Sequence, residues 1–166
     1  MNPRTSIALG AVALLCSGFA LPSAAVAQTA KDLVGTWTFV SSVNIARDGR
    51  RTEGLNKGAL IFDGNGNFVL LAMRSGLPKF SSNNRNTGTP EENKAVVQGS
   101  IGLFGTYTAA DKVVTLKVEG STFPAFEGNE QKRTNVSLTG DELKWTIPES
   151  SGSTGASTEQ TFRRAK

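Results

Sequence analysis

The segment Leu33–Val40, LVGTWTFV, opens a long alternation of apolar and polar residues. The period of two runs over residues 35–45, so that Trp37 and Phe39 fall on one face and the threonines beside them fall on the other. Such alternation, rich in β-branched residues, is typical of a strand with one face buried. We therefore expect the fold to begin with a strand that later strands must cover.

The first 27 residues have the pattern of a secretory signal peptide. Arg4 precedes an apolar run over residues 7–21, and small residues follow it up to Ala27, which ends an Ala-x-Ala cleavage site. The run is shorter than the about 20 apolar residues that a membrane-spanning helix needs. We expect cleavage near Ala27, a periplasmic or secreted protein, and one domain over residues 28–166.

Composition excludes several kinds of site. The one cysteine, Cys16, lies in the predicted leader, and the chain has no histidine. The expected domain therefore lacks disulfides, thiolate ligands and the commonest general base and metal ligand, and we expect no cofactor and no metal. The formal charge of +4 is spread along the chain in ones and twos, whereas a nucleic-acid-binding surface needs clustered basic residues.

Turn residues divide the domain into short strands. Residues 63–66, Asp-Gly-Asn-Gly, predict a tight hairpin because Asn and Gly tolerate positive φ values. The same residues resemble the start of a calcium loop, but Phe68 stands where that loop needs Gly, and no Glu stands at its end. The predicted strands cover residues 35–45, 58–63, 67–74, 103–109, 112–119, 131–139, 142–147 and 157–164. Eight such strands predict an all-β, antiparallel up-and-down barrel, which closes its own edges.

One short helix is expected between the third and fourth of these strands. Thr89 as N-cap, Pro90 at the first helical position and Glu92 form a capping box, so a helix should run to about Gln98. Its apolar residues predict packing against the domain. An insertion as long as residues 75–100 is typical of a lid or of an excursion from the fold.

Three blocks of the sequence resemble the bacterial lipocalin-like domain family, a group of calycin-type barrels. They are LVGTW at 33–37, TPEE at 89–92, and GTY at 105–107 followed by VEGSTFP at 118–124. The resemblance spans nearly all of residues 28–166 and keeps the order of the blocks. It implies an eight-stranded barrel with a cavity.

The resemblance also implies a structural role for the first strand. It places Trp37 at the closed end of the barrel, with Arg163 or Arg164 from the last strand across its indole. Leu116 and Lys117 stand where relatives often carry His, so no His-dependent chemistry is transferred to this chain.

A barrel of about eight strands holds side chains or one small ligand, so inward-facing polar and aromatic residues are the candidates for a site. The candidate ligand-binding residues are Met73, Arg74, Phe104, Tyr107, Glu119, Phe123, Phe126, Arg133 and Trp145. If Glu119 and Arg133 both point inward, they place a charge pair in the cavity. The alternative is that each is an ordinary outward-facing strand residue.

Three functions follow from these candidates. The first is an exported lipocalin-like protein that binds a small, mainly apolar or amphipathic molecule in the barrel cavity. The second is an isomerase or cyclase in which Glu119, Arg133 and Tyr107 supply acid-base and positioning groups. The third is a structural or interaction module without a ligand. We assign no catalytic residue.

Overall fold

The computed structural model describes residues 29–148 and 155–166, so the predicted leader over residues 1–27 lies outside the described residues. The elements are α1 (Ala30–Leu33), β1 (Gly35–Ala46), β2 (Arg51–Glu53), β3 (Lys57–Phe62), β4 (Asn67–Met73), α2 (Pro90–Gly99), β5 (Ser100–Ala110), β6 (Val113–Ser121), the 3-10 helix η1 (Pro124–Phe126), β7 (Glu130–Thr139), β8 (Glu142–Pro148) and β9 (Gly155–Arg164).

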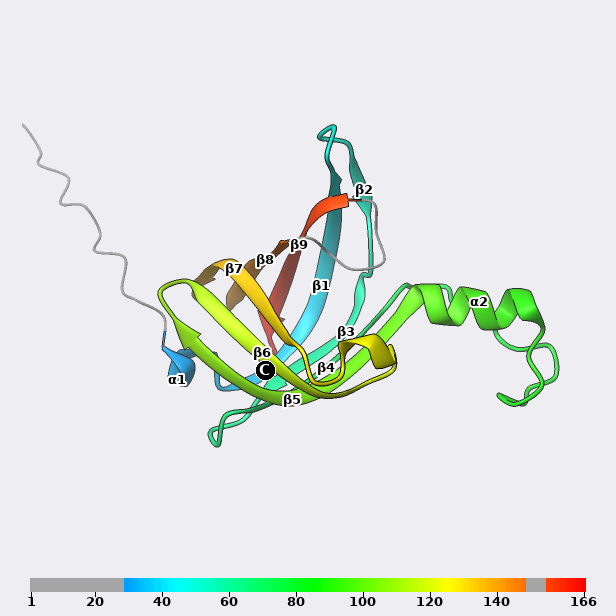
Figure 1. The fold of residues 1–166 in the computed structure, drawn as a ribbon, viewed down its shortest axis with the longest axis horizontal. Coiled ribbons are helices and arrows are strands. Elements are labelled where there is room, and N and C mark those ends of the chain that lie inside the picture. The colour runs from blue at the N-terminus through cyan, green and yellow to red at the C-terminus, as the bar shows by residue number, and fades with distance from the viewer. Residues whose placement is uncertain (1–28, 149–154) are drawn as a thin grey trace, which may run out of the picture.

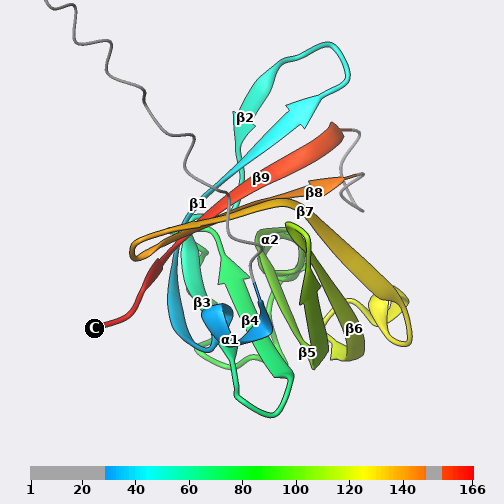
Figure 2. The same ribbon diagram turned by 90° about the vertical axis from the view of Figure 1, so that its left-hand side faces the viewer.

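The described strands form one antiparallel sheet that closes on itself. From β3 to β9 each strand pairs with the next along the chain, and β1 pairs with both β3 and β9. These eight strands form the barrel, whereas β2 pairs only with β1 and lies outside it. Figures 1 and 2 show the closed barrel and the β1–β2 hairpin that extends beyond it. The prediction of an all-β antiparallel barrel is confirmed.

The strand alternation predicted from the sequence decides which residues enter the barrel. In β4, Phe68, Leu70 and Ala72 are buried while the residues between them are exposed. The preceding turn is held by Asp63, whose carboxylate accepts hydrogen bonds from the backbone N–H groups of Asn65 and Asn67 at 2.9 and 2.7 Å. The turn is therefore a hairpin turn, as predicted.

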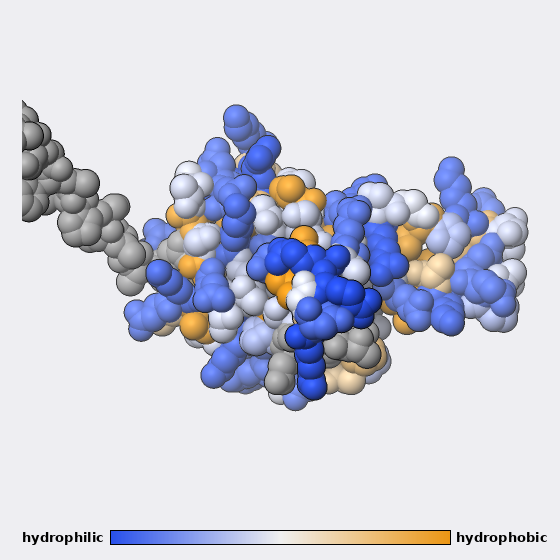
Figure 3. Space-filling model, turned by 90° about the horizontal axis from the view of Figure 1, so that it is seen from above, coloured by the Kyte–Doolittle hydropathy of each residue, from blue (hydrophilic) through white to orange (hydrophobic). Residues whose placement is uncertain are grey.

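The helix α2 does not pack against the barrel. Its predicted capping box is present, since the Thr89 hydroxyl accepts from the Glu92 N–H and the Glu92 carboxylate accepts from the Thr89 N–H. The helix nevertheless projects from the barrel, as Figures 1 and 3 show, and Val97 is 73% exposed. The expectation of packing was wrong, because the apolar positions of this helix are too few to form a buried face.

The helix also lies one strand later than expected. It connects β4 to β5, because the short β2, with no buried residue, adds a strand before it. The sequence gives no periodicity for so short and exposed a strand. Within the described residues, no helix is both long enough and apolar enough to cross a bilayer.

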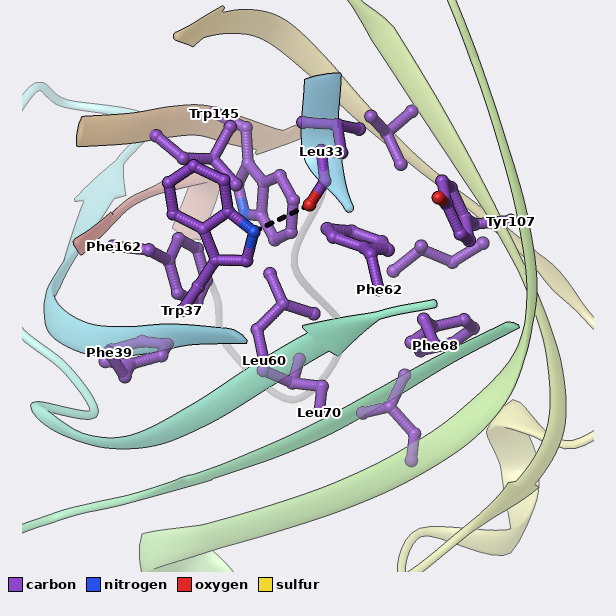
Figure 4. Packing of buried hydrophobic residues seen from close by; sticks show 14 of the residues in the cluster. Leu33, Trp37, Phe39, Leu60, Phe62, Phe68, Leu70, Tyr107, Trp145 and Phe162 are labelled. Carbon is purple, nitrogen blue, oxygen red and sulfur yellow. Dashed lines mark hydrogen bonds between the residues drawn. The ribbon is translucent and has the colours of Figure 1, made fainter. Parts of the chain in front are cut away.

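One end of the barrel is covered by α1 and filled by aromatic side chains. Trp37 is fully buried there, and its indole N–H donates to the backbone oxygen of Leu33 at 2.8 Å (Figure 4). The guanidinium of Arg164 lies 4.1 Å from the centroid of the Trp37 ring. Of the two arginines that the resemblance offered, Arg164 therefore holds this position, while Arg163 is exposed. Gly35 lies beneath the guanidinium with φ +132°, and an added Cβ would come within 2.9 Å of Arg164 Nη1.

We call the end of the barrel opposite α1 the mouth. In an up-and-down barrel, successive connections alternate between the two ends. The tight turns at residues 63–66 and 111–112 therefore share the end with α1, whereas the β4–β5 and β6–β7 connections lie at the mouth. The short connections leave the α1 end closed, so a site for a ligand must be sought at the mouth.

Candidate ligand-binding site

A pocket of about 390 Å³ opens at the mouth, beside the β6–β7 connection that contains η1. Its walls come from this connection, the start of β7 and the end of β8. The lining residues are Phe123, Ala125, Phe126, Asn129, Glu130, Gln131, Lys132, Arg133, Ile147 and Pro148. The volume is within the about 300–1,000 Å³ typical of small-molecule sites.

Aromatic side chains of the β6–β7 connection form one wall of the pocket. The rings of Phe123 and Phe126 meet edge to face, with centroids 5.0 Å apart. Phe126 and Ile147 are half-buried and pack against the barrel core, whereas Phe123 is more exposed. The wall therefore offers apolar surface that continues into the interior.

Arg133 supplies a buried charge to the same pocket. Its side chain enters from β7 and the residue is only 3% exposed. The guanidinium donates from Nη2 to the side-chain oxygen of Gln131 at 2.9 Å and from Nη1 to the backbone oxygen of Lys132 at 3.3 Å. Its Nε is buried and has no partner among the described residues. The guanidinium carbon lies 5.9 Å from the centroid of the Trp145 ring.

Burial changes the pKa of this guanidinium. Desolvation lowers the pKa of Arg133 to about 10. The group therefore still carries its charge at neutral pH. The described residues form ion pairs only on the surface, and none of these pairs involves Arg133.

Arg133 points inward by the alternation of β7, and a bulge follows it in the strand. Up to residue 133 the strand alternates, with Gln131 and Arg133 inward and Lys132 outward. The register to β8 then shifts between residues 134 and 137, where Asn135 has φ +52°. The extra residue brings Val136 back to the interior, so Arg133 and the next buried residue lie three positions apart.

The polar groups closest to the core satisfy one another, and this distinguishes Arg133 from them. The Trp145 indole N–H donates to the side-chain oxygen of buried Gln160 at 2.7 Å. The Thr158 hydroxyl donates to the side-chain oxygen of Asn44 at 2.9 Å. Arg133 Nε, by contrast, is buried and has no hydrogen-bond acceptor among the described residues.

The structure brings only some of the predicted site residues to the pocket. Phe123, Phe126 and Arg133 line it, and Trp145 lies beneath the guanidinium of Arg133. The remaining predicted residues lie elsewhere: Met73 and Arg74 at the end of β4 next to the α2 connection, Phe104 and Glu119 on the outer face, and Tyr107 near α1.

Glu119 does not pair with Arg133. The buried residues of β6 are Val114, Leu116 and Val118, so alternation places Glu119 outside the barrel, where it is exposed. Phe104 of β5 faces the same side and is 53% exposed. Of the two alternatives, the outward-facing one therefore holds for Glu119, so it forms no inward charge pair with Arg133, as the apolar face of β6 already indicated.

Tyr107 is buried but belongs to the α1 end. Its hydroxyl lies 3.1 Å from the backbone oxygen of Asp63 and 3.2 Å from that of Ala30, so it donates to the turn and helix that close this end. Burial, and secondarily the charge of Asp63, raise the pKa of Tyr107. Tyr107, Glu119 and Arg133 thus occupy three separate regions, and the structure assembles no acid-base site from them.

Sequence reasoning missed Ile147, an apolar residue of the site, and also Gln160, which lies outside the pocket lining and accepts from the Trp145 indole. The spacing Thr158, Gln160, Phe162 would have placed Gln160 on the buried face of the last strand. In residues 29–148 and 155–166, no three side chains of His, Cys, Asp or Glu gather closely enough to hold a metal ion.

A family model described as a lipocalin-like domain matches residues 34–165, and this match supports the assignment of the fold. Comparison with curated proteins finds no match. Among solved structures, a redesigned β barrel is similar with a TM-score of 0.44 and 16% identity, over 83% of this chain and 96% of that one.

Proposed function

Because the chain belongs to the family of lipocalin-like domains, we propose that it binds a small, mainly apolar molecule in the pocket at the mouth of its barrel. The α1 end is packed with the buried side chains of Trp37, Phe62, Phe68 and Tyr107, which supports a site at the other end of the barrel. The proposed binding site is therefore the pocket at the mouth.

One observation carries the proposal: the pocket combines an apolar wall with a single buried polar anchor. Phe126 and Ile147 provide surface that a ligand can cover, and removing apolar surface from water contributes about 25 cal/mol per Å². Arg133 fixes the orientation of the ligand by its unused hydrogen-bonding capacity. Small-molecule sites typically consist of such an apolar lining with a few placed polar groups.

Titration with a neutral, apolar, environment-sensitive dye such as Nile red tests the proposal. We expect the fluorescence of the dye to rise and saturate at one dye per chain. Phe126→Ala should weaken binding about tenfold, because it removes the apolar wall.

The matched control is Phe104→Ala, which removes the same ring from the outer face of β5. It should leave the affinity within about twofold, since its ring is outside the pocket. The opposite pattern, in which Phe104→Ala weakens binding and Phe126→Ala does not, would place the dye on the outer surface and contradict the proposal.

We also propose that the protein is exported by the leader over residues 1–27. The apolar run and the Ala-x-Ala pattern support this. The test is the mass and N-terminal sequence of the protein recovered from the periplasm or medium of its host. A start at Gln28 is expected, and recovery of the uncleaved chain from the cytoplasm alone would contradict export.

A further inference from the structure

We propose that the ligand of this pocket is an amphipathic carboxylate, whose carboxylate group pairs with the guanidinium of Arg133 and whose apolar tail lies against Phe126 and Ile147. This inference rests on the proposed function and names the chemical class of its ligand. Its basis is a buried cation for which the described part of the chain supplies no anion.

The burial of Arg133 is unusual among the charged residues of the chain. Among the residues that the structure describes, the buried polar ones are Ser42, Thr158, Gln160 and Arg133, and only Arg133 is charged. A charge removed from water is costly unless an opposite charge and hydrogen bonds replace the lost hydration. In the described structure, the oxygens of Gln131 and Lys132 replace part of the hydration of the guanidinium, but both oxygens are neutral. No carboxylate of residues 29–148 or 155–166 forms an ion pair with it.

The count of hydrogen-bond donors indicates the kind of group that is missing. A guanidinium has five N–H donors, and Arg133 directs one of them to Gln131 and one to Lys132. The Nε–H is among those left, and it is buried. A carboxylate accepts two parallel N–H groups from one guanidinium, which an alcohol oxygen cannot do with the same geometry and charge.

The charged residues at the edge of the pocket do not supply the anion that Arg133 lacks. Glu130 and Lys132 also line the pocket, but both are exposed and their charges are opposite. Glu130 does not approach Arg133 within ion-pair distance. The interior of the pocket therefore carries a net positive charge, which favours an anion and opposes a cation.

The position of the apolar wall determines the rest of the ligand. Phe126 and Ile147 line the same pocket as Arg133, and Trp145 lies beneath the guanidinium of Arg133. A ligand whose charged group reaches the guanidinium therefore places adjoining atoms against apolar side chains. One carboxylate at one end of an aliphatic chain fits this distribution better than a compact polyanion, which would leave the apolar wall uncovered.

Three compounds with the same ten-carbon tail test the inference: decanoate, 1-decanol and decylamine, each titrated into the purified protein by isothermal calorimetry. We expect decanoate to bind about tenfold or more tighter than decanol, since hydrogen bonds to a charged group are the stronger ones. Decylamine should bind more weakly than decanol, because its charge repels that of Arg133. These measurements use the unmodified chain and need no variant.

Arg133→Gln should reduce the affinity for decanoate about tenfold or more and leave that for decanol within about threefold, since only the acid uses the charge. Lys117→Gln is the matched control, because it removes an exposed positive charge from the outer face of β6, outside the lining of the pocket. It should change decanoate binding by less than about threefold.

Equal affinities for decanoate and decanol, or a loss of decanoate binding in Lys117→Gln but not in Arg133→Gln, would overturn the inference. In that case saturable binding of decanol would still support the proposed function. If none of the three compounds nor the neutral dye binds, the proposed function fails together with the inference.

Discussion

The guanidinium of Arg164 lies 4.1 Å from the centroid of the Trp37 indole and donates hydrogen bonds to the backbone oxygens of Val34 and Asp32, both at 2.9 Å. One side chain thus joins the last strand to the first strand and to α1. These contacts close the barrel end that is opposite the pocket.

Removing this side chain should destabilise the barrel. Arg164→Gln loses the cation–π contact and at least one charge-assisted hydrogen bond, so the free energy of unfolding should fall by about 1–3 kcal/mol. Urea denaturation of wild type and variant measures the change. Arg163→Gln is the control, because Arg163 is exposed, and its effect should stay within about 0.5 kcal/mol. Equal effects of the two variants would show that the contact with Trp37 contributes nothing.

A different result is expected for Arg133, because its charge is buried without a counter-ion. In the ligand-free protein, Arg133→Met keeps an apolar side chain beside Trp145 and removes the cost of desolvating the charge. The free energy of unfolding should stay the same or rise by up to about 3 kcal/mol. A loss of more than about 1 kcal/mol would instead mean that Arg133 is retained for stability.

The carboxylate of Asp63 in the hairpin turn should make the stability of the fold depend on pH in the acidic range. Hydrogen bonds from the side chain and backbone of Asn67, with smaller contributions from Asn65, hold the pKa of Asp63 below its usual value. Such a carboxylate stabilises the fold above its unfolded-state pKa of about 3.9, and the contribution is lost as the pH falls through the lower folded-state pKa.

Asp63→Asn should therefore have a lower melting temperature than wild type at pH 7, and the difference should shrink as the pH falls towards about 2. In Asp141→Asn, by contrast, no described residue donates to the carboxylate that is removed, and the melting temperature should stay close to that of wild type. A difference for Asp63→Asn that is the same at both pH values would contradict the assigned role of its charge.

The helix α2 should unfold locally without unfolding the barrel. Thr89→Ala removes the N-cap hydroxyl that accepts from Glu92, which costs about 1 kcal/mol of helix stability. Because α2 projects from the barrel, amide exchange should accelerate in residues 90–99 while the melting temperature stays unchanged. A lower melting temperature would indicate that α2 contributes to the stability of the barrel after all.

The elements specified by local sequence could be predicted. The alternation around Trp37, the Asp-Gly-Asn-Gly turn and the capping box at Thr89 each depend on residues close together in the chain, and each is present. The closing pair of β1 with β9 joins residues more than 100 positions apart. Only the number of strands and the resemblance to a known barrel could suggest it.

The residues of the site were harder to predict, because the direction of each side chain depends on the register of its strand. The apolar residues of β6 alternate up to Val118, which was sufficient to place Glu119 outside, and the register with β5 shifts at this residue. Arg133 follows the alternation of β7 from Gln131, but the bulge at Asn135 comes directly after it, and a single Asn within a strand does not by itself mark a bulge. That Arg133 is buried without an ion pair could be seen only once all neighbouring strands were in place.

Native mass spectrometry of the protein purified from its own host shows whether the pocket holds an amphipathic carboxylate. We expect a wild-type chain that carries a non-covalently bound small molecule, which fragmentation identifies as an amphipathic carboxylate, and a Phe126→Ala variant that has lost most of it. A wild-type protein that binds no small molecule from its host or by titration would contradict the proposed function. A bound molecule retained equally by Phe126→Ala and lost by Phe104→Ala would also contradict it.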